Sequence, residues 1–224
     1  MNRFDAPDLI AIRSRRHLRL VHSIELHANR TMNTLTRADL LSLEAYSAQR
    51  PDFRARVLAH KKHRKLALGP HITLLFEDRL TIQYQIQEML RIERIFEAAG
   101  IQDELDAYNP LIPNGSNLKA TVLLEYPDIE QRKRELARLG GIEHALHADV
   151  DGHPRIHAIV DEDLDRSEAG KTAAVHFARF EFGPARIMAL RAGAALHFGI
   201  DDQRMPIAVT VEGPIRDALL ADFD

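Results

Sequence analysis

Leu66-Ala67-Leu68-Gly69-Pro70-His71-Ile72-Thr73-Leu74-Leu75-Phe76 is the stretch of the sequence that best indicates the fold. Two short runs of β-favouring residues flank Gly69-Pro70, a dipeptide typical of turns, so the stretch predicts two adjacent short strands. The segment that follows, residues 81–98, repeats its apolar residues at intervals of three and four and predicts the longest helix. The apolar residues of this helix are Ile82, Ile86, Met89, Leu90 and Phe96.

The rest of the chain alternates strands and helices irregularly. We expect helices through Leu40 to just before Pro51, at 53–63, 103–108, 128–139, 184–192 and 215–223, and strands at 118–126, 144–150, 156–160, 173–182 and 207–211. The strands at 144–150 and 156–160 predict a hairpin that turns at Asp151-Gly152. Because several strands follow one another directly, the pattern favours an α+β fold. We expect a mixed or mostly antiparallel sheet with flanking helices.

The first 31 residues differ from the rest in composition, because they are rich in Arg and His and lack a clean apolar period. Met32 is followed by Thr36-Arg37-Ala38-Asp39, a helix-start pattern with a hydroxyl cap and an acid three residues later. Residues 1–31 are therefore interpreted as an N-terminal extension, disordered or arising from a misassigned start. Residues 32–224 are interpreted as one α+β domain.

Composition excludes several classes of function. The 224 residues include no cysteine, which rules out disulfides, thiolate catalysis and an iron–sulfur cluster held by the chain's own thiolates. No nucleotide-binding glycine motif is present. A net charge of −3 and the absence of tryptophan argue against nucleic acid as a partner. No apolar run is long enough to span a membrane, and arginines interrupt the N-terminal apolar stretches, so we expect a cytoplasmic protein.

The densest group of chemically useful side chains lies between His71 and Arg94. The predicted helix places Tyr84, Glu88 and Arg91 on one face, and the candidate cluster also includes Glu77, Arg79 and Gln87. One interpretation is a metal site of His71, Glu77 and Glu88 joined by His176, because imidazole and carboxylates are ligands of zinc, iron and manganese. The alternative is a salt-bridge and amide network that ties the helix to the sheet. The spacing matches no standard metal motif, which favours the network.

His176 lies on a predicted strand where alternation puts it on the same face as Ala178 and Phe180. Such a position is typical of a buried structural histidine. A contact with Lys171 or a carboxylate would instead suit a general base. Lys171 and Arg179 complete the candidate cluster.

Two charged runs have a structural and a functional interpretation. The acidic loop of residues 161–168 could hold a divalent cation, but it lacks the ligand spacing of a calcium loop, so a solvated loop is favoured. The basic run of residues 60–65 could contact phosphates. Cations at the end of a helix also complement its dipole, which is the interpretation we favour.

Three stretches after residue 31 carry a resemblance to a known family. They are residues 35–41 with 50–54, residues 69–79 with 84–91, and residues 171–180. On these stretches the chain resembles, over residues 32–224, a bacterial family known as domain of unknown function 3501. The genes of this family often stand beside those of rubrerythrin and an iron–sulfur protein, which implies a role near peroxide defence or electron transfer.

The leading hypothesis is therefore a non-catalytic accessory or binding protein with a rubrerythrin-like or iron–sulfur partner. It depends on the resemblance, the absence of cysteines and the absence of a catalytic motif. The alternative is a metal-dependent enzyme with a His/carboxylate site formed by His71, Glu77, Glu88 and His176.

Overall fold

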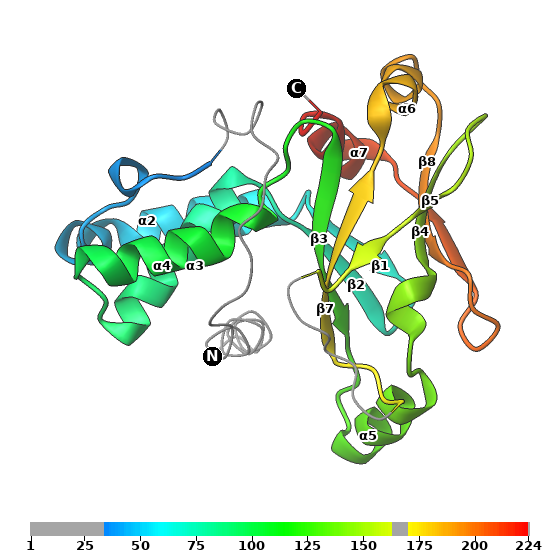
Figure 1. Cartoon of the computed structure of the whole chain (residues 1–224), viewed down its shortest axis with the longest axis horizontal. Helices are drawn as coiled ribbons and strands as arrows, with labels where there is room; N and C mark the ends of the chain where they lie inside the picture. The colour runs from blue at the N-terminus through cyan, green and yellow to red at the C-terminus, as the bar shows by residue number, and fades with distance from the viewer. Residues whose placement is uncertain (1–33, 163–169, 224) are drawn as a thin grey trace.

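Two antiparallel β-sheets lie face to face, and a group of helices projects from one side of them (Figure 1). The computed structural model describes residues 34–162 and 170–223. Sheet A has the strand order β1-β2-β3-β7-β6, and sheet B has the order β5-β4-β8-β9. All strand pairings among the described residues are antiparallel. The predicted α+β class and mostly antiparallel pairing are confirmed, although the strands form two sheets and not one.

Sheet A begins with the strand pair predicted around Gly69-Pro70. The strands of sheet A are β1 (Lys65–Leu68), β2 (Ile72–Phe76), β3 (Asn117–Leu124), β7 (Val175–Glu181) and β6 (Ile159–Val160). Gly69 has φ +70, a left-handed conformation that glycine adopts without steric cost, so it permits the tight turn between β1 and β2. The strand expected at 173–182 is present as β7, and its buried positions alternate as the sequence predicts.

Sheet B contains the predicted hairpin and one strand that the sequence did not reveal. Its strands are β4 (Leu146–Val150), β5 (Ile156–His157), β8 (Leu196–Ile200) and β9 (Ile207–Thr210). The run expected as one strand at 156–160 divides, because β5 pairs with β4 whereas β6 pairs with β7 of sheet A. This short segment therefore crosses from one sheet to the other.

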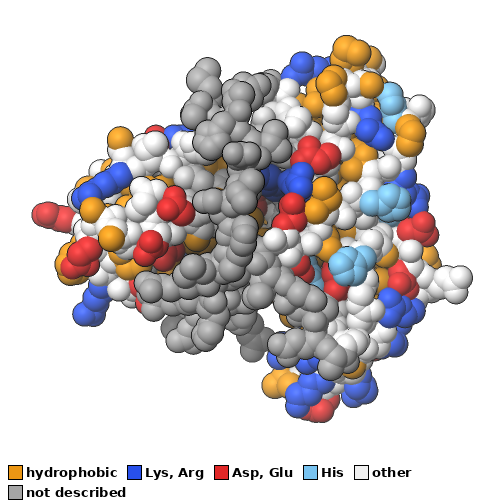
Figure 2. Space-filling view, in the orientation of Figure 1, with side chains coloured by type: hydrophobic (Ala, Val, Ile, Leu, Met, Phe, Trp, Pro, Cys, Tyr) orange, Lys and Arg blue, Asp and Glu red, His pale blue; other side chains and the backbone are white. Residues whose placement is uncertain are grey.

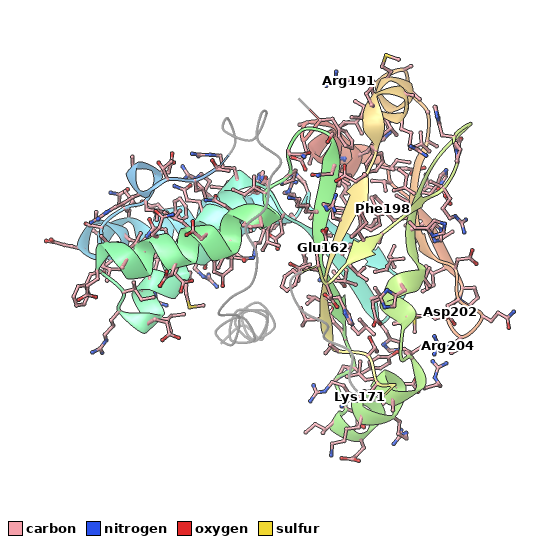
Figure 3. All side chains as sticks on the ribbon, in the orientation of Figure 1. Glu162, Lys171, Arg191, Phe198, Asp202 and Arg204 are labelled. Carbon is pink, nitrogen blue, oxygen red and sulfur yellow. The ribbon has the colours of Figure 1, made fainter. Side chains whose placement is uncertain are left out.

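The main hydrophobic core lies between the two sheets. Phe198 of β8 contacts Phe76 of β2 and Phe180 of β7, with ring centroids 5.0 Å apart in each pair. Figure 3 shows Phe198 between the two sheets. All three rings are at most 1% exposed. Tilted and edge-on contacts of this kind are the favoured arrangements of aromatic pairs, and they fix the spacing of the sheets.

Three helices form an extension that we call the helical arm: α2 (Leu43–Lys61), α3 (Arg79–Glu93) and α4 (Ala98–Tyr108). Figure 1 shows the arm directed away from the sheets. It has a separate hydrophobic cluster, whose buried members are Leu35, Ile82, Ile86, Leu90, Leu105, Tyr108 and Ile112. Ile82, Ile86 and Leu90 of the predicted apolar stripe belong to this cluster, so that part of the prediction is confirmed. Phe96, predicted to be in the same stripe, lies beyond the end of α3 and is 65% exposed.

The boundaries of the arm helices differ from the predicted ones at several places. The helix expected through Leu40 begins only at Leu43, and the helix expected at 103–108 begins at Ala98. Pro51 lies inside α2, which runs without interruption where two helices were expected. Proline cannot donate to the Ser47 carbonyl, but both residues are exposed, so water can satisfy that oxygen. The helix expected to reach residue 98 ends at Glu93, because Arg94 adopts a left-handed conformation with φ 54.

The remaining helices cover the ends of the two sheets. They are α5 (Ile129–Arg138), α6 (Gly183–Arg191) and α7 (Gly213–Leu220). Among the short 3-10 turns, η2 (Arg37–Asp39) and η3 (Asn109–Leu111) pack against α4 in the arm, and η4 (Ile142–Ala145) precedes β4. Within the described residues, no helix has the length and apolar character needed to cross a bilayer. The predicted extension, residues 1–31, lies outside the described part of the chain.

Candidate functional site

A buried chain of polar groups surrounds His176 on the core face of β7. The ring Nδ1 lies 2.6 Å from Asp161 Oδ2, and Nε2 lies 2.7 Å from Thr172 Oγ1 and 3.1 Å from the carbonyl oxygen of Ala173. Thr172 in turn donates to Glu143 Oε2 at 2.7 Å. His176 is fully buried, and Glu143 is 2% exposed. This network of hydrogen bonds joins β7 to η4 and to the residues on both sides of the acidic loop.

The hydrogen-bond partners determine what His176 can do chemically. Nδ1 faces the Asp161 carboxylate, and Nε2 faces the Thr172 hydroxyl and the Ala173 carbonyl, so both ring nitrogens have polar partners within the protein. A general base must reach a proton of its substrate. Although His176 does meet a carboxylate, its ring is fully buried and both nitrogens have internal partners, so the arrangement suits a structural contact better than general-base catalysis.

Asp161 adopts an unusual backbone conformation in this network. Its φ is +50, in the left-handed region where Asp is tolerated better than most residues. The Phe177 N–H donates to Asp161 Oδ1 at 3.0 Å, and the other carboxylate oxygen faces His176. These two contacts hold Asp161 in place. The acidic loop expected to be solvated therefore begins with a buried carboxylate.

A second network centres on Glu88 and joins α3 to α2. Arg50 donates to both carboxylate oxygens, at 2.7 and 2.9 Å, Tyr46 donates at 2.6 Å and Arg91 at 3.1 Å. Burial raises the pKa of Glu88, but the hydrogen bonds from Arg50, Tyr46 and Arg91 outweigh this effect and lower it to about 2. The carboxylate is therefore firmly ionised, and its contacts fix the packing of the arm.

Glu77 and His71 lie at opposite ends of β2. Glu77 is 4% exposed and accepts hydrogen bonds from the hydroxyls of Thr81 and Thr121, both at 2.7 Å. His71 stacks on Tyr126 with ring centroids 4.3 Å apart, and its Nδ1 lies 3.1 Å from the Glu125 carbonyl. Glu77 thereby links the sheet to the start of α3, as expected for a network that ties the helix to the sheet.

The structure does not bring together the four residues considered as metal ligands. His71 and Glu77 are separated by the whole of β2, roughly 20 Å at about 3.3 Å per residue. Glu88 lies in the arm, whereas His176 lies between the sheets. In the described ranges 34–162 and 170–223, no group of three or more His, Cys, Asp or Glu side chains could hold a metal ion.

The other predicted site residues have separate, local contacts. Gln87 accepts from the Leu41 N–H at 2.6 Å and donates to the Leu41 carbonyl at 3.3 Å, so its amide binds a backbone segment. Arg79 pairs with Asp39, Tyr84 stacks on Phe53, Arg91 joins the Glu88 network, and Arg179 pairs with Glu162 and Glu181. Lys171 is exposed and lies beside α5, well away from Glu162 (Figure 3).

A third network, which the sequence did not predict, lies where the arm meets the sheets. Arg64 is 3% exposed and donates to the carbonyls of Phe76 and Glu77, each at 3.1 Å, and to the carboxylate of Asp222. Asp78, which caps α3, lies 3.4 Å from Arg64 Nε. Burial raises the pKa of Asp222 to about 6 despite this arginine. Arg64 belongs to the basic run of residues 60–65, so part of that run is turned inward.

The outer face of sheet B carries His147 of β4, His157 of β5 and His197 of β8, since their neighbours along each strand face the core. His147 is 3% exposed, and burial lowers its pKa. A Cβ atom on Gly199 would lie 2.7 Å from His147 Nε2, so only glycine leaves room for this ring. Arg155 pairs with Asp149 and Asp201 beside it. The face is polar, but its charged groups are paired with one another.

Fold and site together define an α+β protein with two antiparallel sheets, a helical arm and buried polar networks that connect them. The chain belongs to the family described as "Protein of unknown function (DUF3501)", whose model matches residues 34–223, and the resemblance seen in the sequence is thereby confirmed. None of the curated proteins compared with the chain matches it.

A solved structure supports this assignment. The chain is similar to a novel protein of unknown function from Burkholderia pseudomallei K96243, known from a crystal structure. The two are 53% identical, the TM-score is 0.80, and the match covers 85% of this chain and 100% of the other. Both the family match and the similarity to a crystal structure therefore support the assignment.

Proposed function

We propose that this chain is a non-catalytic binding protein that docks a redox partner through the end of its helical arm. The observation that carries the proposal is the exposure of large apolar side chains at that end. Phe96 is 65% exposed and Ile92 is 43% exposed, and they lie four residues apart where α3 leads toward α4. Exposed apolar surface is typical of protein-binding sites, and these two large side chains are close in the sequence at one end of the arm.

Other exposed apolar side chains of the described residues are more scattered. Ile129 lies on α5, Ile159 on β6 and Met188 on α6. Leu58 is 40% exposed on α2, so it also belongs to the arm. The space-filling view shows apolar side chains interspersed with charged ones on the visible face of the arm (Figure 2). An apolar centre with a charged rim is the usual anatomy of a protein interface.

The buried polar networks also favour binding over catalysis. Both ring nitrogens of His176 have polar partners within the protein, and Glu88 accepts four hydrogen bonds from the arm itself. Such contacts serve to hold elements together. The redox character of the partner rests on the gene neighbours of the family, which encode rubrerythrin and an iron–sulfur protein.

The test measures binding of the purified full chain to a purified rubrerythrin-like protein and to a purified iron–sulfur protein by titration calorimetry. The arm variant carries Ile92→Asp and Phe96→Asp. The matched control carries Ile129→Asp and Met188→Asp, which place the same charges on other exposed apolar sites. We expect one redox protein to bind the wild type and the control, and to bind the arm variant at least about tenfold more weakly.

Two results would contradict the proposal. If neither redox protein binds the wild-type chain, the assigned class of partner is wrong. If the control variant weakens binding as much as the arm variant does, the end of the arm is not the docking surface.

A further inference from the structure

The turn between α3 and α4, at the outer end of the helical arm, contains an arginine with a strained backbone (Figure 1). Arg94 ends α3 with φ 54 and ψ 45, in the left-handed region that glycine and asparagine adopt more readily than arginine. Its N–H and that of Ile95 both donate to the Leu90 carbonyl. Strain of this kind persists where the surrounding structure enforces it and is concentrated at functional sites, so the use of the Arg94 side chain needs an explanation.

Ile95 fixes the position of this turn. It packs against the hydrophobic cluster of the arm, and its Cγ2 would lie only 2.7 Å from a Cβ atom placed on Gly100 of α4. The residues on either side of Ile95 are exposed, with Phe96 65% accessible to solvent. A turn held from inside the arm therefore presents a cation and an aromatic ring at its surface.

The guanidinium of Arg94 makes no hydrogen bond, ion pair or ring contact with any other residue that the structure describes. The exposed carboxylate of Glu97, in the same turn, does not pair with it. Ile92 and Phe96 lie two residues before and two residues after Arg94, and both are exposed. An unpaired charge therefore lies within the apolar surface already proposed to dock a partner.

We infer that Arg94 binds a carboxylate of the partner protein, within an apolar contact made by Ile92 and Phe96. This inference rests on the proposed function, because it names the chemistry that the partner presents to the end of the arm. A guanidinium has paired N–H donors that match the two oxygens of a carboxylate. Aromatic residues and arginine are enriched at the centres of protein interfaces, where neighbouring side chains exclude water and thereby strengthen an ion pair. The matching surface is an acidic residue flanked by apolar side chains.

The experiment compares two fluorescent peptides of about 15 residues, long enough to form a helix, that differ only in their polar positions. Both have an apolar face of leucines, and the other positions are glutamate in one peptide and glutamine in the other. Anisotropy measures their binding to the full chain, and thermal unfolding measures the stability of each variant. The test variant is Arg94→Gly. The matched control is Arg132→Gly, which removes an exposed arginine from an ordinary helical position on α5.

We expect the glutamate peptide to bind the wild type and the control, and to bind Arg94→Gly at least about tenfold more weakly. The glutamine peptide should bind the wild type no better than the glutamate peptide binds Arg94→Gly. Stability should change in the opposite direction for the test variant. Arg94→Gly should raise the melting temperature by roughly 2–4 °C, because glycine relieves the left-handed strain, whereas Arg132→Gly should lower it by a similar amount.

Several results would overturn the inference. One is a glutamate peptide that does not bind the wild type or binds it no better than the glutamine peptide does. Another is unchanged binding by Arg94→Gly, and a third is a lower melting temperature for Arg94→Gly, since weaker binding would then come from a damaged turn. Self-association of the wild type that Arg94→Gly abolishes, without peptide binding, would replace the partner with a second copy and also overturn it.

The proposed function and this inference fail separately. If a redox protein binds and the substitutions at Ile92 and Phe96 weaken it while Arg94→Gly does not, the function stands and the inference is wrong. If the glutamate peptide binds through Arg94 but neither redox protein binds, the inference stands and the proposed partner class is wrong.

Discussion

Replacing Glu88 with Gln removes the charge that joins Tyr46, Arg50 and Arg91 while keeping the volume of the side chain. The pKa of Glu88 falls from 4.5 to about 2 in the folded protein, because hydrogen bonds from these residues outweigh the effect of burial. At about 1.4 kcal/mol per pKa unit, the shift corresponds to roughly 3 kcal/mol. The two arginines are partly exposed, so screening reduces the expected loss of stability to about 2 kcal/mol.

The pH dependence makes this prediction specific. A carboxyl whose pKa is lowered by folding stabilises the protein above its unfolded pKa, and that stabilisation is lost as the pH falls toward its folded pKa. Between pH 7 and pH 3.5 the Glu88 contribution should therefore decrease by about 1 kcal/mol. Urea unfolding of the wild type and Glu88→Gln, followed by circular dichroism at both pH values, measures the difference.

The control is Glu130→Gln, which removes an exposed carboxylate that pairs with Lys133 on α5. Its effect should stay within about 0.5 kcal/mol at both pH values. The reasoning about Glu88 is refuted if its substitution costs no more than the control at pH 7. It is also refuted if the cost is the same at pH 3.5 as at pH 7, since the charge would then contribute nothing.

Three further substitutions test other parts of the structure. Between pH 4 and pH 7 the wild type should lose about 2 kcal/mol of stability relative to Asp222→Asn, because a carboxyl whose pKa is raised to about 6 loses its stabilisation as the pH rises through that value. Urea unfolding of both proteins at pH 4 and pH 7 measures this change, and no change would contradict the raised pKa. Gly199→Ala should lower the free energy of unfolding by about 2 kcal/mol or more, because its Cβ would lie 2.4 Å from the Ile207 carbonyl oxygen. An unchanged melting temperature in thermal unfolding would show that the contact relaxes and would contradict this prediction. Thr172→Val leaves buried His176 without a hydroxyl partner and should lower stability by about 1–3 kcal/mol in urea; an unchanged midpoint would contradict the network.

The sequence predicts those elements whose structural signals come from residues close together in the chain. The strand pair around Gly69 and the stripe of α3 were recognised because turn chemistry and helical spacing are local. Pro51 misled the prediction, since an exposed helix tolerates a proline whose missing hydrogen bond water can replace. β8 (Leu196–Ile200) was overlooked, because its alternation is short and includes a glycine.

The candidate site was predictable only where its members lie on one element. Glu88 and Arg91 were expected on one helix face, and they do form an ion pair. Tyr46 comes from another helix, 42 positions earlier, and no spacing rule connects it to Glu88. Alternation along β7 predicted the burial of His176, but the identity of Asp161 as its partner depends on how the chain crosses between the sheets. Long-range contacts of this kind require the tertiary structure.

The position of α3 and α4 in the chain has a consequence for the folding reaction. They are inserted between β2 and β3, which are neighbours in sheet A, so contacts such as Thr121 with Glu77 join residues 44 positions apart. Closing a flexible loop of that length carries an entropic cost that slows strand pairing. The two helices run outward and back (Figure 1) and depend on nearby residues, so they form faster than the sheet. Once formed, the two helices hold the ends of the loop close together, so β2 and β3 have a much shorter distance to cover before they pair.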